Sequence, residues 1–485
     1  MSVLPSALAA MIDQSWSITR PETSPLTLRS PGPGVGTEAT ALAGDEALSR
    51  GRSPDKLTAT NRCARLGGAR SGREHLLAIV VQKYGGSSVA TAEHITAVAE
   101  RIGRARDSGL GLVVVVSAMG KTTDRLLRLA AEVSRDPSPR EIDQLLATGE
   151  EQSVALLAMA LHDRGVAAVS LTGPQAGMTV TGRYGSGVIS EIRPDRVQGL
   201  LRDGQVVIVA GFQGLNAVGD VITLGRGGSD TTAVALAAVI KAERCEIYTD
   251  VAGIYTADPR IVRKARRIEA ISPEEMAEMS WRGAKVMHPR AIELGALYGV
   301  EIHVRSSFCE GPGTVITGGD NLEHLETRET LAGIVHDLDV SRVTLNGIRT
   351  GPGTLSRVFA PLAERGISVD VIVESGVKEG AADVAFTVRR ADFAEARRLA
   401  GEVAGSLGGV VEGEEGLGKV SVVGTGMLNR PGYAARMFAS LGEAGIPIRM
   451  VSTSEIQVTC VLPAGRVEEA VRALHRDFEL EERDV

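Results

Sequence analysis

The segment Leu224–Thr232, which reads LGRGGSDTT, combines residue types that could bind an anion. Its three glycines allow backbone N–H groups to approach a ligand closely, while Arg226 and Asp230 place charged side chains in the same loop. The apolar run Ala233–Ala238 follows directly, so the loop is predicted to open a buried helix capped by Ser229 or Asp230. Helix N-termini attract phosphate and carboxylate groups. A capped turn without a ligand is the alternative for the glycines alone, but the two charged residues favour an anion site.

A second segment of this kind lies near residue 80. The apolar run at 76–81 predicts a buried strand, the sequence QKYGGSS follows it at 82–88, and Thr91 is predicted to open a helix. Lys83 then stands at the end of the strand, beside a glycine turn that could bind a second anion. A plain strand-to-helix turn with a surface lysine is the alternative, which the presence of two such segments disfavours.

The sequence Gly120-Lys121-Thr122 looks like the end of a nucleotide-binding P-loop. It follows the apolar strand predicted at 112–116, but the P-loop pattern requires glycine at position 115, where valine stands. A P-loop is therefore rejected.

Further apolar strands are predicted at 166–171, 206–210, 245–249 and 300–305, with helical patterns between them. This alternation predicts an α/β fold, a three-layer sandwich with a mainly parallel sheet covered on both faces. Ligands bind at the carboxyl ends of such strands, where Lys83, Ser117 and the loop at 224–232 all fall.

Composition favours small-molecule chemistry. The 485-residue chain has a net charge of −7 and 3% aromatic residues, which gives no electrostatic footprint for nucleic acid. Its four cysteines and eight histidines show no metal-ligand spacing, and no apolar run is long enough to span a membrane, so a cytoplasmic protein is expected. Residues 1–75, rich in Ser, Pro, Gly and Ala, are predicted to be a disordered extension before a catalytic domain at 76–325.

Beyond residue 325 the chain repeats itself. Pro352-Gly353 and the pattern after it recur from Pro431-Gly432, an offset of 79 residues (431 minus 352). Each copy predicts a ferredoxin-like βαββαβ unit, one at 326–415 and one at 416–485. The second copy lacks its last strand, and the unassigned run 331–336 is predicted to fill that place and interlock the two units. The exposed sheet edges that remain favour a homo-oligomer, and a dimerisation domain without a ligand is the alternative.

Four stretches resemble the aspartate kinase family over nearly all of residues 78–480: 81–89 (VQKYGGSSV), 223–230 (TLGRGGSD), 248–260 (YTDVAGIYTADPR) and 452–456 (STSEI). The resemblance implies an amino acid kinase fold with two C-terminal ACT units, ATP with Mg²⁺, and L-aspartate as the phosphoryl acceptor. It also implies 4-phospho-L-aspartate as the product, on the route to lysine, threonine and methionine.

The resemblance also implies roles for individual residues. Lys83 would contact the transferring phosphoryl group, Arg226 the substrate α-carboxylate and Glu150 the α-amino group, while Asp230 would share that ammonium or hold Lys83. Ser117 and Thr123 would lie near the β-carboxylate. The residues expected at ATP are Lys83, Tyr84, Gly85, Gly86, Thr249, Asp250, Tyr255, Arg260 and Lys285. The residues expected at an effector are Gly353, Asp370, Ser375, Asn429, Pro431, Ser454 and Glu455. No side-chain cage for the metal is expected, so the nucleotide would hold the ion.

Alternatives remain at two levels. The stretch Val371–Ser375 departs from the family pattern, so the effector could be lysine, threonine or both. A kinase for acetylglutamate, glutamate or UMP is the nearest enzymatic rival, and a catalytically silent amino-acid sensor is a rival of another class.

Overall fold

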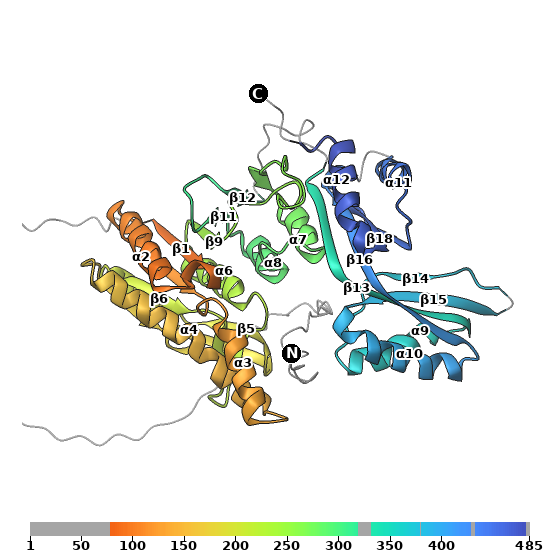
Figure 1. Cartoon of the computed structure of the whole chain (residues 1–485). Coiled ribbons are helices and arrows are strands. Elements are labelled where there is room, and N and C mark those ends of the chain that lie inside the picture. The colour runs from red at the N-terminus through yellow and green to blue at the C-terminus, as the bar shows by residue number, and fades with distance from the viewer. Residues whose placement is uncertain (1–77, 319–330, 379, 428–431, 482–485) are drawn as a thin grey trace, which may run out of the picture. The chain divides into compact units, whose positions relative to one another are not determined.

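The structure, a computed structural model, describes residues 78–318, 331–378, 380–427 and 432–481 (Figure 1). The predicted disordered extension at 1–75 lies outside the described residues, as do Asn429 and Pro431.

An eight-stranded sheet organises the N-terminal part of the described chain, in the order β10-β12-β11-β9-β1-β2-β6-β3. Its strands are β10 (Ala270–Ile271), β12 (Thr314–Ile316), β11 (Ile302–Ser306), β9 (Arg244–Thr249), β1 (Ile79–Tyr84), β2 (Gly111–Val116), β6 (Val206–Ala210) and β3 (Ala168–Leu171). All neighbours from β11 to β3 pair in parallel, and only the β11–β12 pair is antiparallel. The predicted mainly parallel sheet is therefore confirmed.

The first strand lies further along the chain than its apolar run suggested. It begins at Ile79 and continues through the polar residues Gln82 and Lys83 to Tyr84. Gln82 is buried because its side-chain amide donates to Glu246 at 2.9 Å, and Tyr84 stacks on Tyr248 with ring centroids 4.7 Å apart. Because Glu246 and Tyr248 on the neighbouring strand β9 provide these contacts, the polar residues Gln82 and Tyr84 can be buried in the middle of the sheet.

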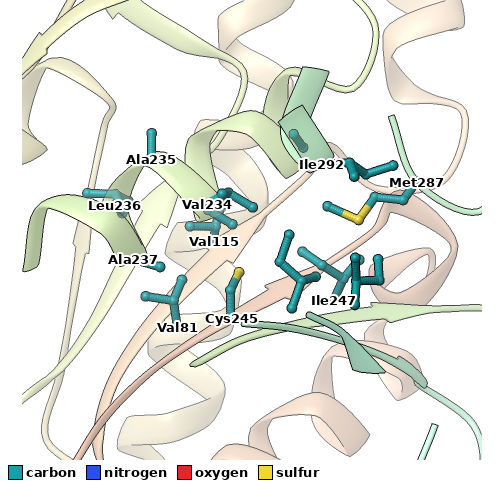
Figure 2. Packing of buried hydrophobic residues seen from close by; sticks show 14 of the residues in the cluster. Val81, Val115, Val234, Ala235, Leu236, Ala237, Cys245, Ile247, Met287 and Ile292 are labelled. Atoms are coloured by element: carbon teal, nitrogen blue, oxygen red, sulfur yellow. The ribbon is translucent and has the colours of Figure 1, made fainter. Parts of the chain in front are cut away.

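Helices cover both faces of this sheet. On one face α2 (Ala92–Asp107) and α4 (Pro139–His162) share a buried cluster with Val114 and Ile208. On the other face α5 (Asp195–Arg202), α6 (Gly228–Ile240), α7 (Pro273–Trp281) and α8 (Pro289–Tyr298) share a cluster with Val81, Val115 and Ile247. Figure 2 shows part of this cluster, with the residues of α6 beside those of the sheet. The predicted three-layer sandwich is confirmed. No described helix is both long and apolar enough to cross a membrane.

Smaller elements complete this part. Helix α3 (Thr122–Val133) packs beside α4, and the 3₁₀ turn η1 (Gly86–Val89) follows β1. A four-stranded sheet is formed by β5 (Ser186–Ile192), β4 (Met178–Arg183), β7 (Gln213–Leu215) and β8 (Val221–Thr223). Strand β8 leads directly into the glycine-rich loop, so this sheet positions the start of that loop.

The C-terminal part is one antiparallel six-stranded sheet with the order β14-β15-β13-β16-β18-β17. Its strands are β14 (Ile372–Glu374), β15 (Ala381–Val388), β13 (Gly333–Arg349), β16 (Val410–Val423), β18 (Gln457–Pro463) and β17 (Met450–Thr453). Its helices are α9 (Thr354–Glu364), α10 (Phe393–Ser406), α11 (Tyr433–Glu443) and α12 (Val467–Asp477). In chain order the first unit reads β13-α9-β14-β15-α10-β16, the expected βαββαβ pattern.

The predicted interlocking of the two units is confirmed. The segment from Gly333 to Asp337 pairs antiparallel with β16 between Val423 and Lys419, which is the place left vacant in the second unit. Residues 342–346 of the same strand pair with the other half of β16 and complete the first unit.

The structure corrects one detail of this arrangement. We expected separate strands for the two units, whereas β13 and β16 each run without interruption through both. Glycines in β16 permit the close packing that this requires, because a Cβ on Gly413 would meet the Phe393 ring at 2.6 Å and one on Gly418 would meet Val467 at 2.6 Å.

Candidate active site

A cleft of about 440 Å³ lies at the carboxyl ends of β1 and β2, beside the start of α6. Among its lining residues are both segments that the sequence singled out, with Lys83 and Gly86 from one and Gly225 to Asp230 from the other. Residues from α3, α4 and β8 complete the wall. The parallel sheet therefore brings the two predicted anion-binding segments into one cavity.

Lys83 and Asp230 form an ion pair inside this cleft. The Lys83 Nζ lies 2.7 Å from Asp230 Oδ1, and the two side chains are 12% and 10% exposed. Lys83 is fixed near the end of a central strand, between β2 and β9. Of the two roles left open for Asp230, this geometry supports the one in which it holds Lys83.

The glycine-rich loop reaches α6 differently from our expectation. The residue before the helix is Gly227, with φ +67°, and no side chain caps the helix. The prediction that Ser229 or Asp230 caps it is wrong, because both residues lie in the first turn and Asp230 instead faces Lys83. Glycine is required at 227 since a Cβ there would lie 2.1 Å from the Cβ of His288.

Glu150 on α4 presents a buried carboxylate to the cleft. Its residue exposure is 4%, Oε1 accepts a hydrogen bond from the Ala118 N–H at 3.1 Å, and Oε2 has no hydrogen-bond partner among the described residues. Burial raises the pKa of this carboxyl to about 8, against the lowering effect of the Ala118 hydrogen bond. Such an oxygen is suited to a cationic ligand group that enters the cleft.

Asp143 is a site residue that sequence reasoning missed. It is fully buried on α4, where its carboxylate accepts hydrogen bonds from the Gly185 N–H, the Thr223 N–H and the Thr223 hydroxyl at 2.7 to 2.9 Å. Burial raises its pKa, although these three bonds oppose the shift. Because Asp143 stands seven residues before Glu150, helical spacing on one face was the signal that could have found it.

Phe212 is a second missed residue of the cleft wall. Its φ of +71° is unusual for a residue with a side chain, and its N–H donates to the Thr232 hydroxyl at 3.2 Å. Backbone conformations of this kind concentrate at functional sites, and nothing in the local sequence indicated this one.

The structure brings most of the predicted active-site residues together. The predicted residues that line the cleft are Lys83, Gly86, Ser117, Thr123, Glu150, Arg226, Asp230, Thr249 and Lys285. Gly85, Asp250, Tyr84, Tyr255 and Arg260 are not among the lining residues. Tyr84 is fully buried in the core. Tyr255 packs against the hydrophobic core of the second C-terminal unit, and the Arg260 side chain is 88% exposed and paired with Asp258.

A second cavity, also of about 440 Å³, lies in the first C-terminal unit. It is formed by residues 350–356 with Glu374 and Val377, and so includes Gly353 of the predicted effector residues. Asp370 is instead paired with Lys419 and Arg282, and the Ser375 hydroxyl accepts from the Asp383 N–H at 2.8 Å. Ser454 and Glu455 are exposed between β17 and β18.

Two family models match the chain. The amino acid kinase family matches residues 78–306 and the ACT domain matches residues 420–478. The fold and the cleft agree with these matches, and together they define a phosphotransferase of the amino acid kinase class with a C-terminal ACT sheet. The predicted enzyme class is thereby confirmed.

Relatives narrow this class. An aspartokinase from Geobacillus stearothermophilus is 47% identical over 407 residues, which cover 84% of this chain and 98% of the relative. One from Pseudomonas aeruginosa is 44% identical over 406 residues, with 84% and 98% covered. The structure of E. coli aspartokinase III in complex with aspartate and ADP has a TM-score of 0.70 at 28% identity, and covers 82% of this chain and 99% of that one. The chain belongs to the aspartokinase family.

Proposed function

We propose that this chain transfers the γ-phosphoryl group of ATP to the β-carboxylate of L-aspartate, giving 4-phospho-L-aspartate and ADP. The observation that carries the proposal is the partnerless Oε2 of Glu150, buried in the same cleft as Arg226. A zwitterionic amino acid supplies both complements, an ammonium for Glu150 and an α-carboxylate for the planar guanidinium of Arg226. Ser117 and Thr123, which also line the cleft, are available to the β-carboxylate.

The chemistry needs charge neutralisation more than proton transfer. An aspartate side chain with a pKa of about 3.9 is already ionised at neutral pH, so its oxygen can attack the γ-phosphorus without a general base. The new carboxyl oxygen–phosphorus bond forms as the bond to the ADP oxygen breaks, and charge is spread over the transferring group. Lys83, which Asp230 holds at 2.7 Å, places a cation beside this group.

The nucleotide is proposed to lie along Thr249 and Lys285, the two predicted ATP residues of the cleft that stand apart from the glycine segments. The described residues contain no group of three or more His, Cys, Asp or Glu side chains placed to hold a metal ion. This fits a Mg²⁺ held by phosphate oxygens and water, where the ion would neutralise nucleotide charge. Asp250, Tyr255 and Arg260 are not among the residues that line the cleft, so the proposed placement of ATP rests on Thr249 and Lys285.

We also propose that the ACT sheet carries feedback regulation. The cavity at 350–356 begins at the N-terminus of α9, and Glu374 supplies an anion for an ammonium group. The structure of E. coli aspartokinase III in complex with lysine and aspartate, at a TM-score of 0.66 and 29% identity, makes lysine the first effector to test, with threonine second. The free edges at β14 and β17 favour a homo-oligomer. The product would enter lysine, threonine and methionine biosynthesis.

The test is an assay of ADP release with four acceptors: L-aspartate, N-acetylglutamate, L-glutamate and UMP. Only L-aspartate should support turnover. N-acetylglutamate lacks the ammonium that Glu150 requires, and UMP lacks both the ammonium and the α-carboxylate. L-glutamate has both groups, but its extra methylene displaces the side-chain carboxylate from the place proposed for the β-carboxylate beside Ser117 and Thr123. Faster ADP release with any other acceptor would contradict the proposal, and no release with any acceptor would favour a catalytically silent sensor.

A further inference from the structure

Helix α7 of the kinase domain is tied to the ACT sheet near its first turn. Glu275 is 6% exposed, and its Oε1 accepts hydrogen bonds from the N–H and the hydroxyl of Thr425 at 2.9 and 2.7 Å. The buried face of the helix, Met276 and Met279, belongs to the same apolar cluster as Val423 at the end of β16. This end of α7 therefore moves only if these partly buried hydrogen bonds break.

The other end of α7 is held by charges and by a backbone contact. Arg282, the C-cap, lies 2.8 Å from Asp370 and 2.7 Å from Glu278, and Asp370 is also 2.6 Å from Lys419 of β16. Next to it, a Cβ on Gly283 would lie 2.0 Å from the carbonyl oxygen of His336 in β13. Both long strands that the two ACT units share thus contact α7.

The chain that follows α7 contacts the glycine-rich loop from Leu224 to Asp230. Lys285 and Val286 line the cleft, the His288 N–H donates to Asp230 Oδ2 at 3.4 Å, and Arg290 donates to the Leu224 carbonyl oxygen at 3.2 Å. The His288 side chain also packs directly over Gly227. These contacts reach both ends of the loop that carries Arg226.

We propose that residues 273–290 act as one positioning element, which sets the loop from Leu224 to Asp230 according to how α7 is held against the ACT sheet. The proposal rests on the function proposed above and names the route by which ACT units would regulate that site. Coupling requires an element with two arrangements that both sites bias, and residues 273–290 are the segment that contacts both the ACT sheet and the loop from Leu224 to Asp230.

The Arg282–Asp370 ion pair, called the joint below, is the contact of this element that is best placed to change. Asp370 is 40% exposed at its side chain, unlike the buried Glu275, and it stands two residues before β14. Glu374, the last residue of β14, lines the cavity of the first ACT unit. A ligand that displaced β14 would therefore move Asp370 relative to Arg282.

The test compares full-chain variants of the joint with a matched control pair. Arg282→Gln, Asp370→Asn and their double variant remove the joint, while Arg342→Gln breaks a 2.7 Å pair with Glu414 inside the ACT sheet. Thr425→Val removes the hydroxyl bound to Glu275, and Thr425→Ser keeps it. Each enzyme is assayed for the KM of aspartate, for kcat and for Tm.

The expected result is a KM for aspartate raised on the order of fivefold in Arg282→Gln, Asp370→Asn and Thr425→Val, with kcat within about twofold. The double variant should raise the KM by less than the product of the two single effects, because the two substitutions break the same Arg282–Asp370 pair, although Arg282 also pairs with Glu278 and Asp370 with Lys419. Arg342→Gln and Thr425→Ser should match the wild type in KM. A KM in Arg282→Gln and Thr425→Val equal to that of Arg342→Gln would overturn the proposal.

Hydrogen exchange tests the same idea without substrate. In Arg282→Gln, amides of residues 224–232 should exchange faster while those of β2 stay unchanged. No change at 224–232, or an equal change throughout the chain, would refute the positioning role. Failure of the proposed function would appear separately, as wild-type ADP release that does not depend on aspartate.

Discussion

Glu150 should make the affinity for aspartate depend on pH. Its pKa of about 8 means that the carboxyl is mostly protonated at pH 7 in the free enzyme, because burial disfavours the charged form. An ammonium group binds the carboxylate, so binding at pH 7 must include the loss of this proton. The KM for aspartate should therefore fall as pH rises toward 8 and then level off.

The size of the effect follows from the pKa. One pH unit below it, ionisation costs about 1.4 kcal/mol, so the KM at pH 7 should be roughly tenfold above its limiting value. Glu150→Gln should remove this slope and lose roughly 3 kcal/mol of aspartate binding at pH 9, where wild-type Glu150 is ionised. At pH 7 the loss should be smaller by about 1.4 kcal/mol, because the wild type then bears the cost of ionisation.

Glu150→Gln should weaken aspartate binding but stabilise the ligand-free fold at high pH. A folded-state pKa raised from 4.5 to about 8 makes the ligand-free protein lose stability as pH rises from 4.5 through 8, by at most roughly 5 kcal/mol. Without ligand, Glu150→Gln should therefore have a higher Tm than the wild type at pH 8.5 and a similar one at pH 5.

The assay measures the KM for aspartate from pH 6.5 to 9 in the wild type, Glu150→Gln and Glu151→Gln. Glu151 is the next residue on α4 and does not line the cleft, so Glu151→Gln removes the same charge outside the site. In this variant the KM for aspartate should still fall with pH and then level off. The levelling should come at a slightly lower pH, because the charge of Glu151 raises the Glu150 pKa. A flat wild-type profile, or a slope retained in Glu150→Gln, would refute the role given to Glu150.

Three further predictions concern catalysis, domain limits and stability. Lys83→Ala should lower kcat by at least ~10²-fold, roughly 3 kcal/mol of transition-state stabilisation, in a steady-state assay; near-normal turnover would remove Lys83 from the chemistry. Deleting residues 1–74 should leave kcat and Tm almost unchanged, since the family match begins at residue 78, and loss of soluble enzyme would contradict this. Ile334→Ala should cost about 2–4 kcal/mol in urea unfolding, because Ile334 is 1% exposed in the core of the second ACT unit, whereas Val410→Ala, 63% exposed on β16, should cost less than 1 kcal/mol.

The sequence was sufficient for features that depend on local pattern. The apolar runs of β2 and β6 are buried at every position, so their residues alone predict central strands. Lys83 and Arg226 were found because each stands in a glycine segment at the end of a strand. The vacancy in the second ACT unit was visible because a βαββαβ unit requires a fourth strand, and only one apolar run was unassigned.

Features that depend on distant partners could not be read in this way. In the sequence Asp143 looks like an ordinary helical aspartate. Its hydrogen-bond donors, Thr223 and Gly185, are 80 and 42 residues away along the chain, so only the fold shows them. Tyr84 follows Lys83 in the motif, but alternation of side chains along β1 directs its ring into the core against Tyr248. The cap at Gly227 likewise depends on His288, which approaches too closely for any side chain at that position.

The two long strands that cross the ACT sheet restrict how the chain can change in length. The pairing of β13 with β16 shifts register between Asp337 and Arg342, but on either side of that stretch the side chains alternate between the faces of the strand, so one residue inserted at 333–337 or at 342–346 would reverse the inward face of one ACT unit relative to the other. Val343 and Ile334, both buried, could then not face their own cores at the same time. Insertions and deletions should therefore accumulate in the turns that flank β13 and β16, and sequences that diverge from this chain should keep the spacing between their two ACT cores.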